Sequence, residues 1–329
     1  WLFDLPAKDG DRTGIARRAI DGLAKLDPAP LAAPGLAAHI GAANYDEHLD
    51  RLAECDLVIE AIAERLDWKR ELFARIAPHL APHAILASNT SGLSISALAA
   101  GLPDELQSRF CGIHFFNPPR YMHLVELIPA PASAPAMLDA LETFLTTALG
   151  KGVIRAKDTP NFIANRIGVF SILAAFHHAH ALGLGFDEID ALTGTRLGRP
   201  KSATFRTADV VGLDTLAHVI GTMQSGLPDD PWHAYFAAPE WLRGLIASGA
   251  LGQKTRGGIY RKVGATITVL DPATGAHRTA DRDIDPDVAG ILKLRDPHAR
   301  FAALRASPHP QASACPRPKQ KSASGFQSS

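Results

Sequence analysis

Short apolar runs alternate with helix-like segments over the first half of this 329-residue chain, and this alternation restricts its fold more than any other feature. The strand-like runs stand at 1–4, 56–62, 84–88, 110–116, 123–128 and 152–156. The segments with helical periodicity lie between them, at 12–26, 67–80, 94–102 and 135–149. Strands that alternate with helices favour a mainly parallel sheet covered on both faces. The sequence therefore predicts an α/β fold with a doubly wound, Rossmann-like sheet.

The strand–helix alternation ends near residue 157, where we place the boundary of the first domain. Thr159 and Pro160 are suited to cap and open a helix, which Gly183 closes. Helical patterns continue from there to about residue 262. Residues 158–262 are therefore predicted to form an all-α domain.

The remaining chain divides into two parts of different composition. Residues 263–306 contain a hairpin pattern at 265–280 and a charged helical pattern at 288–304, so we expect an ordered extension there. Residues 307–329 contain no Val, Ile, Leu or Met. Such a segment buries too little apolar surface to offset its ordering entropy, and we predict that it is disordered.

The composition excludes several classes of partner. Lys plus Arg equals Asp plus Glu at 34 each, so no overall field recruits nucleic acid or an acidic membrane surface. No apolar run approaches the ~20 residues of a membrane span. The three cysteines are widely spaced and form neither a disulfide framework nor a metal motif, which favours the cytosol. His177 and His180 are one helical turn apart, but no carboxylate or thiol completes a set, so no metal site is expected.

Two ionisable residues interrupt neighbouring apolar strands, "CGIHFF" and "HLVELI". Glu126 shares a strand face with Leu124 and Ile128, where a carboxylate needs a partner. His114 is the nearest candidate, across the "NPP" turn. An imidazole held at Nδ1 by a carboxylate keeps Nε2 available as a base. The pair predicts a general base directed at a hydroxyl group; the alternative is two unrelated core polar groups, each satisfied by backbone.

Further polar residues follow the ends of other predicted strands, where open α/β sheets bind ligands. Asn89 and Ser91 come directly after the run at 84–88, and Glu64 and Lys69 follow the run at 56–62. Taken singly, these residues have ordinary explanations, because "SNTSGLSI" reads as a helix cap and the two charges as a solvated face.

Five motifs, in their order and separations, resemble the 3-hydroxyacyl-CoA dehydrogenase family: "SNTSGLSI", "HFFNP", "LVELI", "KDTPNFIANRIG" and "GQKTRGGIYRK". The resemblance covers residues 1 to about 262. It extends to about 310 in the long bacterial members, which carry an enoyl-CoA hydratase-like part. It implies that an L-3-hydroxyacyl-CoA is oxidised to the 3-ketoacyl-CoA by NAD in fatty acid β-oxidation. It also implies a C-terminal helical domain at 158–262 and an extension at 263–306 toward a second helical repeat.

The resemblance also assigns roles to individual residues. His114 would be the base and Glu126 its orienting partner, while Ser91 and Asn165 would hold the acyl-CoA substrate. The positions that match cofactor contacts of the family are Asp4, Glu64, Lys69, Asn89, Ser91, Asn117 and Lys254. A carboxylate at Asp4 favours NAD over NADP, because it would repel a 2′-phosphate. A homodimer through the helical domain is one option for its assembly.

The chain departs from the family at several places. Asn161 and Arg256 stand where the family usually has glycine, and the change at Arg256 is expected to disturb the turn that presents Lys254. No glycine fingerprint precedes Asp4, so we expect a chain truncated at both ends, whose sheet lacks the first strand. Two hypotheses therefore stand: an NAD-dependent dehydrogenase, or an inactive fragment or pseudoenzyme domain that binds acyl-CoA or a partner subunit.

Overall fold

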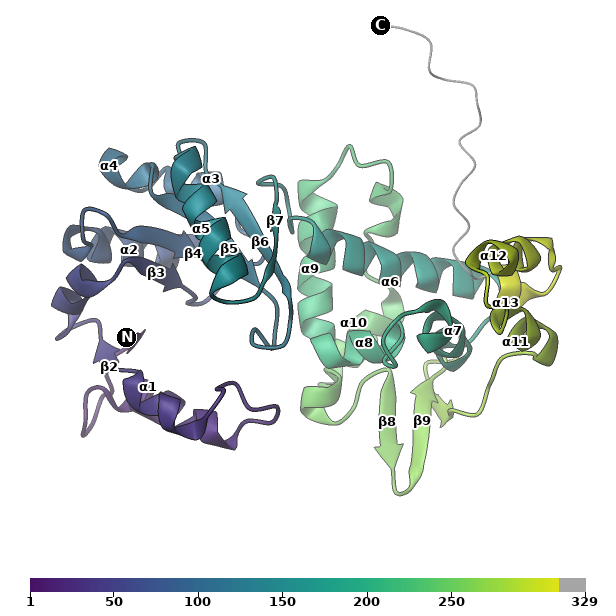
Figure 1. Cartoon of the computed structure of the whole chain (residues 1–329). Coiled ribbons are helices and arrows are strands. Elements are labelled where there is room, and N and C mark those ends of the chain that lie inside the picture. Colours follow the sequence, from purple (N-terminus) through teal and green to yellow (C-terminus); the bar gives the residue numbers. More distant parts are fainter. Residues whose placement is uncertain (314–329) are drawn as a thin grey trace, which may run out of the picture. The chain divides into compact units, whose positions relative to one another are not determined.

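The computed structural model describes residues 1–313, which form two compact units (Figure 1). The first unit is Trp1–Ile163 and the second begins at Ala164. The expected boundary at residue 157 falls short of this division. The reason is that Phe162 is buried in the core of the first unit and the Ile163 N–H donates to Glu126.

The first unit contains a mixed sheet of five strands in the order β3-β4-β5-β6-β7, and a separate parallel pair, β1-β2. No strand pairing joins these two sheets within residues 1–313. The strands are β1 (Leu2–Asp4), β2 (Ala42–Asn44), β3 (Leu57–Glu60), β4 (Ile85–Ser88), β5 (Phe110–Phe115), β6 (Leu124–Pro129) and β7 (Gly152–Arg155). Strands β3, β4 and β5 are parallel, whereas β6 is antiparallel to β5. The short connection between β5 and β6 explains the reversal, because a parallel connection needs a dozen residues or more.

Helices cover both faces of the five-stranded sheet. They are α2 (Leu66–Ile76), α3 (Ile95–Ala99), α4 (Asp104–Gln107) and α5 (Pro135–Thr147), whereas α1 (Gly14–Gly22) packs on the β1-β2 pair. Helices α2, α3 and α4 pack on the face formed by Leu86, Phe110 and Ile128. Helix α5 packs on the opposite face, which includes Ile113 and Leu127. Each strand therefore alternates between two apolar layers, as a sheet buried on both faces requires.

The register of β5 and β6 places His114 directly opposite Glu126. Both side chains lie on the sheet face that α3 covers, since Phe110 and Ile128 of the same strands face that layer. Gly112 lies on this face too, and a Cβ there would come within 2.7 Å of Ile95 Cδ1. The glycine thus lets α3 pack close to the strand that carries His114.

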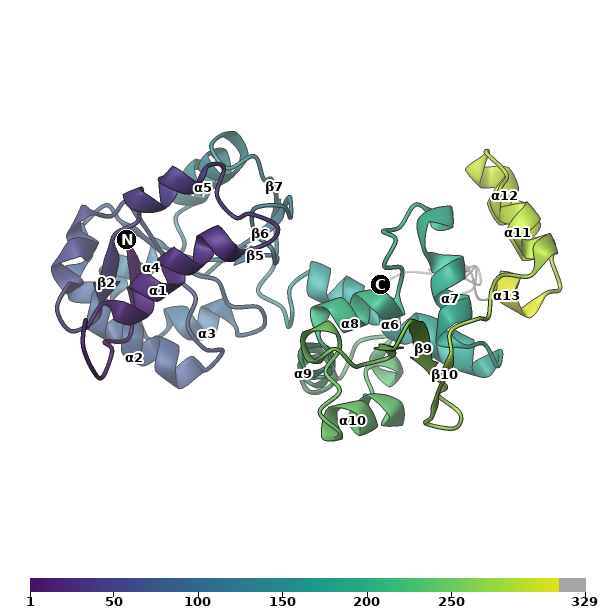
Figure 2. The same cartoon turned by 90° about the horizontal axis from the view of Figure 1, so that it is seen from below.

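The second unit is mainly helical. Its helices are α6 (Ala164–Ala181), α7 (Phe186–Thr193), α8 (Phe205–Val211), α9 (Leu213–Gly226), α10 (Glu240–Ala247), α11 (Pro286–Leu292), α12 (Pro297–Ala306) and α13 (Pro310–Ser313). Its strands, β8 (Tyr260–Val263), β9 (Thr266–Leu270) and β10 (His277–Thr279), form an antiparallel sheet in the order β10-β9-β8. The predicted hairpin at 265–280 is confirmed as β9 and β10, which lie side by side in Figure 2. The pairing of β8 with β9 was not expected, because residues up to 262 had been assigned to helices only.

Two helices of the second half differ from expectation. Helix α6 begins at Ala164, several residues after Pro160, because Asn161 and Phe162 adopt left-handed backbone conformations with φ of 60° and 49°. The single helix predicted at 288–304 is two helices, α11 and α12, and Asp296 caps the second one, which starts at Pro297.

The prediction of disorder from residue 307 is wrong for residues 310–313. They form α13, in which Gln311 is buried and donates to Glu188 and to the Asp283 carbonyl. Residues 314–329 of the predicted disordered segment lie outside the described part of the chain. Among residues 1–313, no helix is long and apolar enough to cross a membrane.

Candidate active site

A histidine and a glutamate form a buried pair at one edge of the five-stranded sheet. His114 Nδ1 lies 2.7 Å from Glu126 Oε2, and the two residues are 3% and 0% exposed. Glu126 Oε1 accepts the Ile163 N–H at 2.9 Å. Both carboxylate oxygens therefore have a donor, as a buried charge requires. Within residues 1–313, His114 Nε2 has no hydrogen-bond partner, so this nitrogen is the one that can accept a proton.

Aromatic rings border the imidazole. The rings of Phe116 and Phe162 lie 4.5 and 5.7 Å from that of His114, measured between centroids. Phe162 holds its left-handed backbone conformation at this point, and Asn161 before it is buried against Gly92. Backbone strain of this kind persists only where the surroundings enforce it, and it gathers at functional sites.

A second buried charge network lies at the carboxyl ends of β3 and β4. Lys69 is 1% exposed, and its Nζ donates to Glu60 Oε1 at 2.6 Å and to the Ile62 carbonyl at 3.2 Å. Ser88 donates to the other oxygen of Glu60 at 2.7 Å. The network fixes the start of the loop after β3 and ties it to β4.

Glu64 joins that loop to the segment after β4. Its Oε1 accepts from the Thr90 hydroxyl at 2.5 Å and from the backbone N–H groups of Ser91 and Gly92 at 2.9 and 3.0 Å. Its Oε2 lies 3.7 Å from Lys69 Nζ. Glu64 and Lys69, the two residues predicted from the segment after β3, are thus in contact, and Glu64 holds the backbone of the exposed Ser91 in place.

Asn89 connects β4 to β5. Its Oδ1 accepts the Phe115 N–H at 2.9 Å, and its own N–H donates to the Glu60 carbonyl at 2.7 Å. Asn117 is exposed, and its peptide bond to Pro118 is cis. Asp4 ends β1 and is half-buried; its Oδ1 accepts the Leu5 N–H. These residues and Glu64 all follow the carboxyl ends of parallel strands.

A second set of contacts fastens the chain after β7 to the start of α3. Asp158 accepts from the Ser94 hydroxyl and from the N–H groups of Ile95 and Ser96, all at 2.8 to 2.9 Å. Burial would raise the pKa of Asp158, but the hydrogen bonds from Ser96, Ile95 and Ser94 together hold it below its usual value. The carboxylate therefore stays charged at the start of a helix, where it is favoured.

Two predicted site residues belong to the second unit. Asn165 is half-buried near the start of α6. Lys254 Nζ contacts both oxygens of Asp214, at 2.7 and 2.6 Å, and lowers the pKa of that carboxyl group. Arg256, in the same turn, adopts the left-handed conformation with φ of 58°. The turn forms nevertheless, with hydrogen bonds between Gly252 and Gly257, so the expected disturbance is not present.

No group of three or more His, Cys, Asp or Glu side chains within residues 1–313 could hold a metal ion. The rings of His177 and His180 instead pack on Tyr235 and Phe176.

The sequence analysis missed Glu60, which interrupts the apolar run "DLVIEAI" just as Glu126 interrupts "HLVELI". The same criterion, an ionisable residue inside a buried strand, would have found it.

The arrangement at this edge of the sheet suits a proton transfer beside a bound nucleotide. Open α/β sheets bind their ligands beyond the carboxyl ends of the strands, and His114 lies near that end of β5. A doubly wound domain with such a pair, followed by a helical domain, belongs to the class of two-domain α/β proteins that bind dinucleotides.

Comparison with known proteins narrows this class. Residues 14–159 match the NAD binding domain of 3-hydroxyacyl-CoA dehydrogenase, and residues 162–262 match its C-terminal domain. The chain is therefore a member of the 3-hydroxyacyl-CoA dehydrogenase family. Residues 263–313 lie beyond both matches.

Individual relatives agree with this assignment. A probable 3-hydroxyacyl-CoA dehydrogenase of Deinococcus radiodurans is 40% identical over 262 residues, which are 79% of this chain and 75% of that protein. One from Bacillus subtilis is 38% identical over 293 residues, 89% of this chain, but the chain spans only 37% of its length. The crystal structure of FadB2 from M. tuberculosis is 30% identical, with a TM-score of 0.67 over 79% of this chain and 89% of that one.

Proposed function

We propose that this chain oxidises an L-3-hydroxyacyl-CoA to the 3-ketoacyl-CoA with NAD, as a step of fatty acid β-oxidation. The observation that carries the proposal is the His114–Glu126 pair, with its 2.7 Å contact, at the carboxyl edge of a family NAD-binding domain. The relatives in Deinococcus radiodurans and Bacillus subtilis are named for this activity, which supports it.

His114 is the general base in this proposal. Glu126 fixes the hydrogen on Nδ1, so Nε2 presents its lone pair and takes the proton of the C3 hydroxyl. The same carboxylate stabilises the positive charge that the imidazole gains. The chemistry that NAD supplies when bound is acceptance of the hydride from C3. Because the pair is buried, the charge on Glu126 acts on the imidazole with little screening by water.

The residues around the carboxyl edge suit a dinucleotide. Asp4, half-buried at the end of β1, can accept from both hydroxyls of a ribose, and its charge disfavours a 2′-phosphate. Glu64, Asn89, Ser91 and Asn117 follow the ends of β3, β4 and β5 in the five-stranded sheet. Lys69 is more restricted than the family resemblance implies, because Glu60 already holds its buried ammonium group, so we propose that it acts on the cofactor through Glu64.

The substrate contacts are also proposals. Ser91 is exposed and its backbone is held by Glu64, so its hydroxyl is available for the oxygen of the substrate. Asn165 supplies an amide for the thioester end, and Lys254 a cation for the cofactor. Four further points stay predictions from the sequence: the homodimer through the helical domain, the cytosolic location, the upstream glycine loop and the fused hydratase-like part.

The test is a turnover assay on the full-length parent protein, which would carry the upstream glycine loop predicted from the sequence. Acetoacetyl-CoA reduction, followed through NADH absorbance, should proceed with wild-type protein and fall ~10²–10⁴-fold in His114→Gln, the usual effect of losing a general base. NAD affinity, measured by calorimetry, should change little, because the base acts on the substrate. His83→Gln is the matched control, since His83 is an exposed histidine that pairs with Asp56 on another loop.

Two results would contradict the proposal. Turnover of His114→Gln within a few-fold of wild type would exclude the histidine as the base. A wild-type chain that binds acyl-CoA in calorimetry but shows no turnover would favour the inactive acyl-CoA-binding domain instead.

A further inference from the structure

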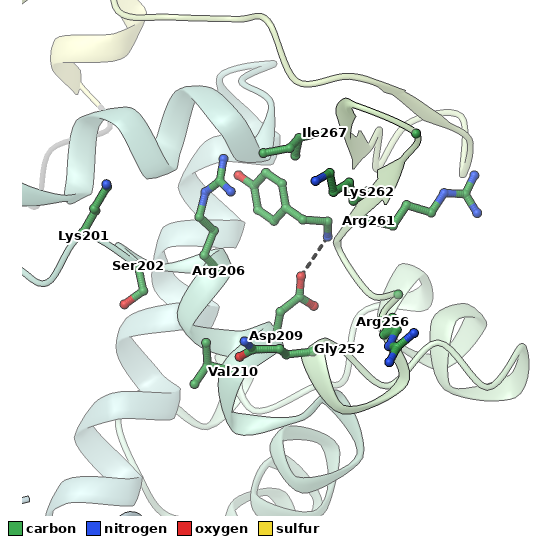
Figure 3. A pocket seen from close by; sticks show the side chains of 14 residues that line it. Lys201, Ser202, Arg206, Asp209, Val210, Gly252, Arg256, Arg261, Lys262 and Ile267 are labelled. Carbon is green, nitrogen blue, oxygen red and sulfur yellow. Dashed lines mark hydrogen bonds between the residues drawn. The ribbon is translucent and has the colours of Figure 1, made fainter. Parts of the chain in front are cut away.

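A hollow of about 1130 Å³ lies wholly within the second unit, and none of the residues assigned above lines it (Figure 3). Its walls come from α8 and the loop before it, the turn at 252–257, and the β8–β9 hairpin. This volume is slightly larger than the ~300–1,000 Å³ that is usual for small-molecule sites.

Positive charge is concentrated around this hollow. The basic residues that line it are Lys201, Arg206, Arg256, Arg261 and Lys262. Asp209 (Figure 3) is the one acidic residue in the lining. Its two oxygens accept the N–H groups of Ile259 and Tyr260 at 2.9 and 2.8 Å. The carboxylate is thus already occupied by the backbone.

These cations have few charged partners. Within residues 1–313, the only ion pair of the five is a 4.0 Å approach of Arg206 Nε to Asp190. By contrast, Lys254 nearby is fully paired with Asp214. Because the whole chain has no net charge, this cluster is a local excess rather than a share of a general surplus.

Arg206 is held ready for a ligand. Its guanidinium carbon lies 4.1 Å from the centre of the Tyr260 ring, and the Tyr260 hydroxyl donates to Asp190 at 2.9 Å. Asp190 also accepts the backbone N–H of Arg206 at 3.0 Å. The stacking fixes the planar group, while its N–H groups make no hydrogen bond within residues 1–313. A fixed guanidinium fork suits two oxygens of one phosphate.

The hollow also offers apolar surface and open main chain. Val210 and Ile267 line it and are 61% and 45% exposed. Ile267 is paired across the hairpin with Lys262, so an aliphatic side chain and a cation lie side by side. Gly257 and Gly264 also line it, and a Cβ at either would meet no atom within 4 Å. A ligand can therefore approach the backbone closely there.

We propose that this hollow binds a nucleotide through its phosphate groups, which Arg206 and Lys262 contact, while Val210 and Ile267 receive the base or sugar. Coenzyme A and free nucleoside triphosphates share this chemistry. The proposal does not depend on the dehydrogenase activity, because none of these residues belongs to the site at the sheet edge.

The test uses binding of a fluorescent mant-ATP probe to the whole chain. We expect saturable binding that weakens as salt is added. Arg206→Gln with Lys262→Gln should weaken it by roughly 10- to 100-fold, the usual effect of losing hydrogen bonds to a charged group. Lys293→Gln with Arg295→Gln removes the same charge from exposed positions outside the hollow, and should change affinity by no more than about twofold.

Two further variants distinguish a loss of binding from a loss of folding. Lys262→Gln alone alters an exposed hairpin residue, and Arg206→Lys keeps the charge but loses the fork; each should weaken binding while the thermal melt stays that of wild type. Failure of the wild-type chain to bind, or equal losses in the Lys293/Arg295 control, would overturn the proposal.

Competition separates the sources of the nucleotide. If coenzyme A displaces the probe better than dephospho-coenzyme A and ATP, the 3′-phosphate of coenzyme A is the ligand group. If ATP displaces it best, the ligand is a free nucleotide. Inorganic tripolyphosphate that competes as well as either would overturn the assignment of the apolar wall to a base or sugar.

Discussion

Replacing Glu126 by glutamine keeps the shape of the side chain but changes what its two ends can do. In the native pair, one oxygen faces His114 Nδ1 and the other faces the Ile163 N–H, so both ends act as acceptors. Glutamine has one acceptor oxygen and one NH2 donor. Whichever way the amide turns, one of the two contacts sets a donor against a donor.

The two orientations have different consequences. If the NH2 faces His114, the imidazole must accept at Nδ1 and carry its hydrogen on Nε2, where it can no longer act as a base. If the oxygen faces His114, the buried Ile163 N–H loses its acceptor, which costs ~1–3 kcal/mol. The rate then falls at least roughly 10- to 100-fold, for loss of a charge-assisted hydrogen bond. It falls up to about 10⁴-fold if the wrong tautomer prevails, as when a catalytic triad loses its carboxylate.

Two measurements separate these cases. Turnover of acetoacetyl-CoA gives the size of the loss, and nitrogen-15 NMR of the imidazole identifies the tautomer of His114. Glu142→Gln is the matched control, because Glu142 is only partly buried and pairs with Arg155, away from His114. Its turnover and its His114 spectrum should equal those of wild type. Unchanged turnover in Glu126→Gln, together with hydrogen still on Nδ1, would refute the assignment of Glu126 as the orienting group.

Three further predictions concern stability. Lys69→Met leaves the buried carboxylate of Glu60 without its cation and should lower the free energy of unfolding by ~3–5 kcal/mol. Lys254→Met breaks an exposed pair with Asp214 and should lower it by at most ~1 kcal/mol. Denaturant titrations measure both losses, and similar losses for the two variants would contradict the buried network. Arg256→Gly removes a side chain from a left-handed residue and should raise the melting temperature, corresponding to up to ~1 kcal/mol; a lower one would show that the arginine stabilises the turn. Burial raises the pKa of Asp190 to about 6, so its protonation favours the folded state: this contribution is complete below the unfolded value of 3.8 and is lost as pH rises through 6. Asp190→Asn should flatten the melting temperature over this pH window, and an unchanged slope would exclude Asp190 as its source.

The sequence predicted six of the seven strands of the first unit and the faces of the residues around His114 and Glu126, because a period of two needs only the order of apolar residues. The opposition of His114 and Glu126 followed from this period and from the short turn between their strands. Contacts between residues far apart in the chain could not be predicted from this pattern. The bond from Thr90 to Glu64 depends on which strands are neighbours, and β2 is too short for its pattern to be detected.

Other differences arose where tertiary structure overrides local preference. A cap and a proline at 159 and 160 are a sound helix start, yet Phe162 is drawn into the core of the first unit and delays α6. Likewise, residues 310–313 have the composition of a disordered segment. A single side chain, Gln311, secures them, since it also accepts the Asp285 N–H at 2.7 Å. Composition cannot reveal such a single anchoring contact.

The bond from Ile163 to Glu126 has a consequence for how the two units are connected. Ile163 is the last residue of the first unit, and its N–H shares a carboxylate with the imidazole. Any tension along the chain at the entry to α6 is therefore transmitted through one carboxylate to the imidazole. The NMR chemical shift of the His114 side chain would then report any change in the position of the Ile163 N–H.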